Sequence, residues 1–196
     1  MKISVKTALL FLILCPTLSW AQTNKSLAKV NMFAGKEVYY NSDPVNKYTV
    51  VYSINTVLPA PSITEKFNAS FVVNYIINKA NDTAAKVKKP FDAIITIEGS
   101  SKDIAVKFNE PMDSTKQRLT NVRRCGDKYV FVLCEPVNPY EVVFEIISKP
   151  KFPVSIVETV MRKAMRKGIF SKKKKPFDAI IIGSDKTHFA IKFKEV

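Results

Sequence analysis

The feature that most constrains the fold is an internal repeat, in which three blocks of sequence recur in the same order farther along the chain. The clearest block reads K-K-P-F-D-A-I-I in both places. The matching pairs are residues 43–52 and 135–144, residues 88–95 and 174–181, and residues 104–108 and 189–193. The spacing between matched positions falls from 92 to 86 and then to 85 residues, so the second copy has lost a few residues. Collinear blocks of this kind indicate a duplicated structural unit.

Each copy is expected to contain four strands and one helix. Apolar residues alternate with other residues through Tyr48, Val50, Tyr52 and Ile54, which is the period of a strand with one face on a core. A Pro-Val-Asn segment before this strand is typical of a chain reversal. The expected strands are residues 37–41, 48–55, 91–97 and 104–108 in the first copy and 129–133, 140–147, 177–181 and 189–193 in the second.

The same start pattern precedes both expected helices. Ser62 is followed three residues later by Glu65, and Ser155 is followed by Glu158, which is the pattern of a capping box. An apolar stripe follows each start, and Gly168 is expected to end the second helix as glycines often do.

These patterns predict an α+β fold built as a tandem duplication of a β-β-α-β-β unit, with an antiparallel sheet and one helix per repeat. We expect the two repeats to pack as a pseudo-two-fold pair. Repeat 1 is placed at residues 31–110 and repeat 2 at residues 123–196, with linkers at 22–30 and 111–122. The sequence leaves open whether the eight strands form one sheet or two, and it leaves open the oligomeric state.

The first 21 residues have the pattern of a secretory signal peptide. Lys2 and Lys6 precede a seven-residue apolar run, which is too short to span a bilayer, and cleavage is expected after Ala21. An alternative is a lipoprotein signal with Cys15 as the lipid acceptor. The chain is therefore expected to be exported, to the periplasm or the extracellular space, and no later stretch predicts a transmembrane segment.

Positive charge is concentrated in the second repeat. Residues 31–110 hold 9 basic and 8 acidic side chains, whereas residues 123–196 hold 16 and 8, a net charge of +8. This excess predicts contact with an anionic lipid or polysaccharide surface or with an acidic protein, although a solvated helix face and loop would produce the same pattern. The candidate binding residues are Arg162, Lys163, Arg166, Lys167, Lys172, Lys173, Lys174 and Lys175.

The residues that usually carry catalysis are sparse. His188 is the single histidine, and Asp92 and Asp178 occupy equivalent positions where cross-strand pairing with lysines is the expected role. Cys125 and Cys134 could form a disulfide only across a sharp turn at Gly126. No phosphate-binding loop, metal motif or nucleophile motif is found, so no cofactor or metal is expected.

These observations favour a non-enzymatic binding protein that engages an anionic surface or partner through the basic second repeat. The alternative is a proteinaceous inhibitor or immunity-type protein that blocks a single enzyme by shape. A third hypothesis is a hydrolase that uses the aspartate pair or His188. Nucleic acid is the least expected partner, because export argues against it and no recognition motif accompanies the basic run.

Overall fold

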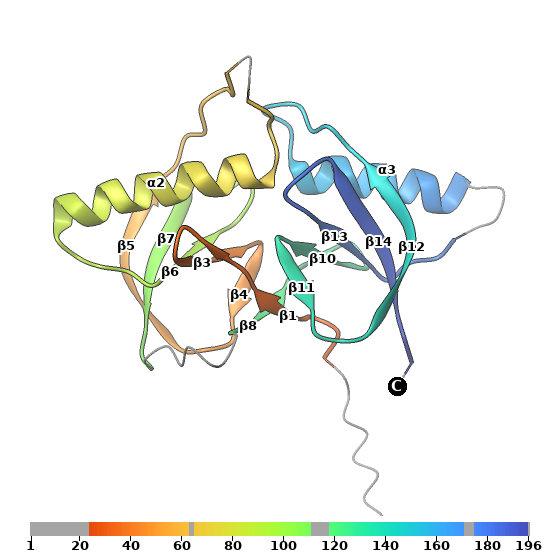
Figure 1. The fold of residues 1–196 in the computed structure, drawn as a ribbon, viewed down its shortest axis with the longest axis horizontal. Helices are drawn as coiled ribbons and strands as arrows, with labels where there is room; N and C mark the ends of the chain where they lie inside the picture. Colours follow the sequence, from red (N-terminus) through yellow and green to blue (C-terminus); the bar gives the residue numbers. More distant parts are fainter. Residues whose placement is uncertain (1–23, 63–64, 111–117, 171–174, 196) are drawn as a thin grey trace, which may run out of the picture.

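The computed structural model describes residues 24–62, 65–110, 118–170 and 175–195. The expected signal peptide lies outside this part of the chain. The described residues form a mixed α+β structure with three sheets and two helices (Figure 1). The helices are α2 (Ala69–Val87) and α3 (Ile156–Phe170). The strands of the first half are β1 (Leu27–Val30), β2 (Met32–Phe33), β3 (Lys36–Tyr40), β4 (Ser42–Pro44), β5 (Tyr48–Asn55), β6 (Ala93–Thr96) and β7 (Lys102–Phe108). Those of the second half are β8 (Leu119–Val122), β9 (Arg124–Cys125), β10 (Lys128–Val132), β11 (Cys134–Pro136), β12 (Tyr140–Ile147), β13 (Ala179–Ile182) and β14 (Thr187–Phe193).

Two five-stranded sheets have corresponding strand orders, β2-β3-β6-β7-β5 in the first half and β9-β10-β13-β14-β12 in the second. Both are mixed sheets, because β3 pairs with β6 and β10 pairs with β13 in parallel. The expectation of a purely antiparallel sheet was therefore wrong. After β3 the chain runs to β5 at the far edge and returns through the helix to lie beside β3, and such a crossover is what places neighbouring strands parallel.

Even the irregularities of the two sheets correspond. The pairing of β5 with β7 shifts register between Val50 and Tyr52, and that of β12 with β14 shifts between Val142 and Phe144. These positions are 92 residues apart, which is the spacing of the repeated block that contains them.

The third sheet joins the halves, with the order β11-β1-β8-β4. Strand β1 of the first half pairs with β11 of the second, and β8 of the second half pairs with β4 of the first. The two exchanged strands pair with each other at the centre. Residues 22–30 and 111–122 were expected to be linkers, but each includes one of these exchanged strands.

The two helices begin near the middle of the molecule and run outward in opposite directions (Figure 1). Helix α2 begins six residues later than the capping-box pattern placed it, since Asn68 is its N-cap and accepts the Phe71 N–H at 2.8 Å. Helix α3 begins as expected, with Ser155 Oγ accepting the Glu158 N–H at 3.0 Å. It continues past Gly168 to Phe170, so Gly168 does not end it. A Cβ at Gly168 would lie 3.2 Å from both the Lys175 carbonyl oxygen and the Phe177 ring, so glycine permits close packing there.

The core has two layers. Beneath the helices, one continuous apolar cluster runs through both halves and includes Val73 and Ile77 of α2 together with Val160 and Ala164 of α3. The opposite faces of the two large sheets are covered by the central sheet, through which Val30 and Val122 enter two smaller clusters. The exchanged strands therefore bury the second face of each half.

Candidate anion-binding site

Four of the predicted binding residues form one exposed face of α3, which we call the α3 basic face: Arg162, Lys163, Arg166 and Lys167. The opposite side of the helix is buried through Val160 and Ala164. This division follows from the helical period, which places residues three and four apart on one side. Lys175 is also exposed, and Lys172, Lys173 and Lys174 lie outside the described residues.

Two of the four cations bind the neighbouring edge strand. Lys163 Nζ donates to the Ile147 carbonyl oxygen at 3.1 Å, and Lys167 Nζ donates to the Glu145 carbonyl oxygen at 2.7 Å. The Lys167 ammonium also lies 5.5 Å from the centroid of the Phe144 ring. These lysines thus help to cover the outer edge of β12, a role that the sequence did not indicate.

The two arginines are placed differently. Arg162 and Arg166 lie one turn apart, and no hydrogen bond or ion pair is found for either guanidinium within the described ranges. Two adjacent, planar, permanently charged groups are suited to bidentate contact with anionic oxygens.

The two aspartates considered for catalysis make hydrogen bonds that stabilise the sheets. Asp92 Oδ2 accepts the Phe108 N–H and Asp178 Oδ2 accepts the Phe193 N–H, both at 3.0 Å, so each carboxylate holds the end of a hairpin. The described residues contain no ion pair for either aspartate, so the expected cross-strand pairing with lysine was wrong. Each carboxylate instead accepts a backbone N–H at the end of the neighbouring strand, and the nearby Lys107, Lys192 and Lys194 are exposed.

His188 is almost fully buried, with 1% of its surface exposed, and neither ring nitrogen has a hydrogen-bond partner. Burial, together with the nearby Lys163 ammonium, lowers the pKa of His188 to about 4. In the described part of the chain, neither nitrogen of this buried neutral imidazole is hydrogen-bonded to a nucleophile or a carboxylate. Its observed surroundings are those of a core residue.

The two cysteines are free. Cys134 is buried in the cluster beneath the central sheet, and burial raises the pKa of its thiol to about 12. Cys125 packs instead against the layer beneath the helices. The disulfide that the sequence left open is therefore not formed, although Gly126 supplies the turn, with a φ of 64°.

A carboxylate from the first half caps the helix of the second half. Glu98 accepts hydrogen bonds from the Ile156 N–H at 2.6 Å, the Val157 N–H at 3.1 Å and Ser155 Oγ at 2.8 Å. A negative group at this place also interacts favourably with the positive end of the helix dipole. No short sequence pattern indicates this contact, because Glu98 and α3 are nearly 60 residues apart and belong to different halves.

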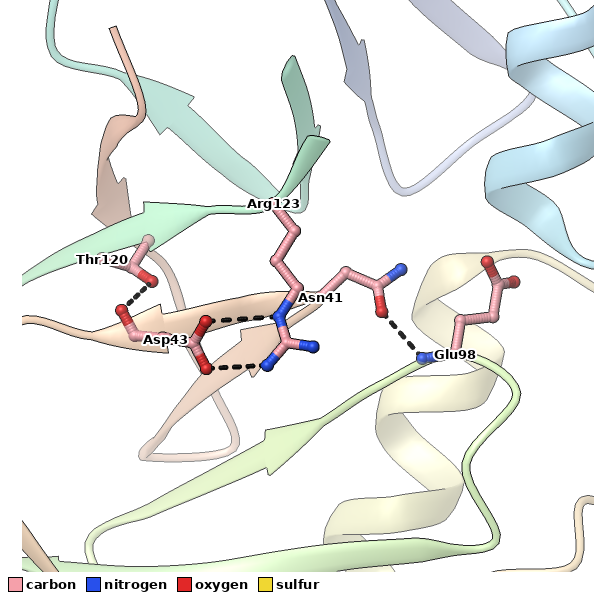
Figure 2. A network of polar contacts seen from close by, with 5 residues as sticks. All are labelled: Asn41, Asp43, Glu98, Thr120 and Arg123. Atoms are coloured by element: carbon pink, nitrogen blue, oxygen red, sulfur yellow. Dashed lines mark hydrogen bonds and ion pairs between the residues drawn. The ribbon is translucent and has the colours of Figure 1, made fainter. Parts of the chain in front are cut away.

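Glu98 is positioned by the network at the junction (Figure 2). Its backbone N–H donates to Asn41 Oδ1 at 2.8 Å, while its side chain extends away from Asn41. Nearby, Arg123 contacts Asp43 through two hydrogen bonds of 3.2 and 2.9 Å, and Thr120 Oγ1 donates to the Asp43 carbonyl oxygen at 2.9 Å. These contacts join β8 to β4 and so hold the two halves together around Glu98.

The described residues contain no group of three or more His, Cys, Asp or Glu side chains that could hold a metal ion. None of the helices in the described ranges is long and apolar enough to cross a membrane. Comparison with known proteins finds no matching family model, curated protein or solved structure.

Proposed function

We propose that this protein is an exported, non-enzymatic binding protein that engages an anionic lipid or polysaccharide surface through the α3 basic face and the adjoining Lys172–Lys175. The observation that carries the proposal is the pair Arg162 and Arg166, which are exposed on successive turns with no carboxylate paired to either in the described part of the chain. Cations near an anionic membrane surface each contribute about 1 kcal/mol to binding.

The proposal includes the origin of the fold in a tandem duplication arranged as a pseudo-two-fold pair. The corresponding strand orders of the two large sheets, their equivalent register shifts and the reciprocal exchange of β1 and β8 support it. When a structural unit is duplicated, one copy can maintain the fold while the other acquires a binding surface. The two copies differ in this way, with net charges of +1 for residues 31–110 and +8 for residues 123–196.

The test is cosedimentation of the purified protein with vesicles of phosphatidylcholine containing anionic phosphatidylglycerol, and retention on immobilised acidic polysaccharide, both across a series of salt concentrations. Wild-type protein is expected to bind at low salt and to lose affinity steeply as salt rises, because exposed charges are screened. The vesicle and polysaccharide arms distinguish the two sources of the anionic surface.

The variant Arg162→Gln/Arg166→Gln is expected to weaken binding by about tenfold or more, since each charged contact contributes about 1 kcal/mol. The matched control is Lys79→Gln/Lys86→Gln, which removes the same charge from exposed positions on α2. Equal losses in the two variants would reduce the effect to net charge and contradict the proposal. No binding to either surface would also contradict it and would favour a specific protein partner, as in the inhibitor hypothesis.

A further inference from the structure

The first turns of the two helices are built alike. Asn68 Oδ1 accepts the Phe71 N–H at 2.8 Å, as Ser155 Oγ accepts the Glu158 N–H at 3.0 Å. The Val72 N–H donates to the Asn68 carbonyl oxygen at 3.2 Å, and the Thr159 N–H donates to the Ser155 carbonyl oxygen at 3.0 Å. Each helix therefore presents its remaining N-terminal N–H groups in the same way.

The two helices differ in what accepts hydrogen bonds from these remaining N–H groups. At α3 they are the Ile156 and Val157 N–H groups, and both donate to the carboxylate of Glu98. The equivalent donors of α2 belong to Ala69 and Ser70, and no hydrogen bond is found for either within the described ranges. By the spacing of the K-K-P-F-D-A-I-I block, the counterpart of Glu98 is Ser184, which is exposed and carries no charge.

A cavity of about 490 Å³ lies at this open end of α2. Its volume is in the range of small-ligand pockets. Its lining residues include three lysines and one acid, together with the N-cap: Lys66, Asn68, Ser148, Lys149, Asp185 and Lys186. The Asp185 carboxylate is exposed and is not hydrogen-bonded to the helix in the described structure. The cavity, which we call the α2 pocket, therefore combines a helix N-terminus with a net charge of +2.

A buried donor without a partner also belongs to the wall of the α2 pocket. Ser148 is fully buried, and its hydroxyl has no hydrogen-bond partner. A buried hydroxyl without a partner costs free energy. The Ser148 hydroxyl is enclosed in the pocket wall, so a ligand that supplies an acceptor is favoured once this side chain turns toward the pocket. It is an observation independent of the helix terminus, because Ser148 follows β12 and its N–H is held by the Lys186 carbonyl oxygen at 2.8 Å.

We propose that the α2 pocket binds the carboxylate of an external ligand, which accepts hydrogen bonds from the Ala69 and Ser70 N–H groups and pairs with Lys149 and Lys186. The same interaction already occurs within this chain, since the Glu98 carboxylate accepts the equivalent N–H groups at α3. The cavity is larger than one carboxylate, so the ligand is an organic acid or an acidic segment of a polypeptide. This site is separate from the α3 basic face and does not depend on the function proposed for that face.

The experiment follows the backbone amide resonances of Ala69 and Ser70 in ¹⁵N-labelled protein during titration with glutarate, with a short glutamate-rich peptide and with inorganic phosphate. Saturable shifts of both resonances are expected with the carboxylates. The glutarate and peptide arms separate a free organic acid from a protein-borne carboxylate. Equal or tighter binding of phosphate would overturn the assignment to a carboxylate.

The variant Lys149→Gln/Lys186→Gln is expected to weaken glutarate binding by about tenfold or more, since hydrogen bonds to charged groups are the stronger class. Lys79→Gln/Lys86→Gln is the control of equal charge and is expected to leave the affinity unchanged. Ser184→Glu places a carboxylate at the position equivalent to Glu98 and is expected to block the ligand. The amide spectrum of each variant reports whether it is folded. An absence of saturable shifts with every probe, or an unchanged affinity in Lys149→Gln/Lys186→Gln, would overturn the proposal.

Discussion

The two helices of this protein rest on matching sheets and begin with matching caps, yet their N-termini have opposite electrostatic surroundings. At α3 the Glu98 carboxylate accepts two backbone N–H groups and the Ser155 hydroxyl. At α2 the corresponding place is a cavity lined by Lys66, Lys149 and Lys186. One helix terminus is satisfied within the chain, whereas the other is open to a ligand.

The difference extends to the buried residues behind each terminus. Asp103 in β7 and His188 in β14 are equivalent by the 85-residue spacing, and both are nearly fully buried. Burial raises the pKa of Asp103 and lowers the pKa of His188. The two halves thus keep corresponding strand orders, while the same buried position holds an acid in one half and a neutral imidazole in the other.

The largest predicted difference between the halves concerns Arg118. Its guanidinium lies 3.5 Å from the buried Glu37 carboxylate and 3.6 Å from the centroid of the Phe108 ring. Arg118→Ala is expected to lower the free energy of unfolding by about 3–5 kcal/mol, because it leaves a buried carboxylate without its cation. Chemical denaturation measures this change.

In the other half, the ring equivalent to Phe108 is Phe193, and the cation over it is Lys25, which is exposed and lies 5.7 Å from the ring centroid. Lys25→Ala is expected to cost less than about 1 kcal/mol. In the Arg118→Ala background, Glu37→Gln is expected to restore part of the lost stability by removing the charge. Similar losses of unfolding free energy in Arg118→Ala and Lys25→Ala would contradict the predicted difference between the two halves.

The second prediction concerns pH. The pKa of His188 is about 4 in the folded protein and near 6.5 in the unfolded chain, so the unfolded state binds more protons between these values. His188 therefore contributes stability that is complete above pH 6.5 and is lost as the pH falls toward 4. The loss amounts to about 3 kcal/mol over that window. Unfolding curves recorded from pH 7 to pH 4 measure it.

The variant His188→Leu is expected to remove this pH dependence. Lys163→Gln removes the nearby cation, so it is expected to raise the folded-state pKa of His188 and to reduce the pH range over which stability is lost. Asp103 acts with the opposite sign, because its raised pKa means that stability is lost as the pH rises through its folded-state pKa. A wild-type pH profile identical to that of His188→Leu would contradict the assignment.

The third prediction compares the two helix termini directly. Glu98→Gln is expected to cost about 1–2 kcal/mol, because it removes a charged acceptor from two backbone N–H groups and from the end of the helix dipole. Ser184→Glu is expected to stabilise the protein by about 0.5–1 kcal/mol for the same reason. Thermal unfolding of the two variants measures both changes. A destabilising effect of Ser184→Glu would show that the termini are not equivalent.

The smallest effect is expected on the α3 basic face. Arg162→Gln/Arg166→Gln is expected to change the free energy of unfolding by less than about 0.5 kcal/mol, since neither guanidinium has a partner in the described structure. Lys163→Gln/Lys167→Gln is expected to cost about 1 kcal/mol, because it removes the hydrogen bonds to the β12 carbonyl groups. Equal effects of the two double variants would remove the distinction between the arginines and the lysines.

Several elements could be predicted from short patterns. Alternation placed β5 and β12 to within a residue, and Ser155 was correctly identified as the cap of α3. The exposed side of α3 follows from its helical period. Each of these features depends on residues within about two turns or one strand of each other, which is the range over which side-chain periodicity reports burial.

Other elements could not be predicted in this way. Asn68, not Ser62, caps α2, because the position of the helix on its sheet decides where the first turn begins. The binding of Lys163 and Lys167 to β12 depends on the distance between a helix and an edge strand that is distant in sequence. The linker assignment failed because β1 and β8 are short and each is paired on both sides by strands remote from it.

The sequence by itself determined the two helices, most of the long strands, the side of α3 that carries the cations and the correspondence between the repeated blocks. These features arise from local periodicity and from the chemistry of adjacent residues. Only the tertiary structure decided the parallel pairing of β3 with β6, the exchange of β1 and β8, the capping of α3 by Glu98 and the open pocket at α2. Each of these depends on which distant segments come together to bury apolar surface and to satisfy backbone N–H groups, and no short window of sequence contains both partners.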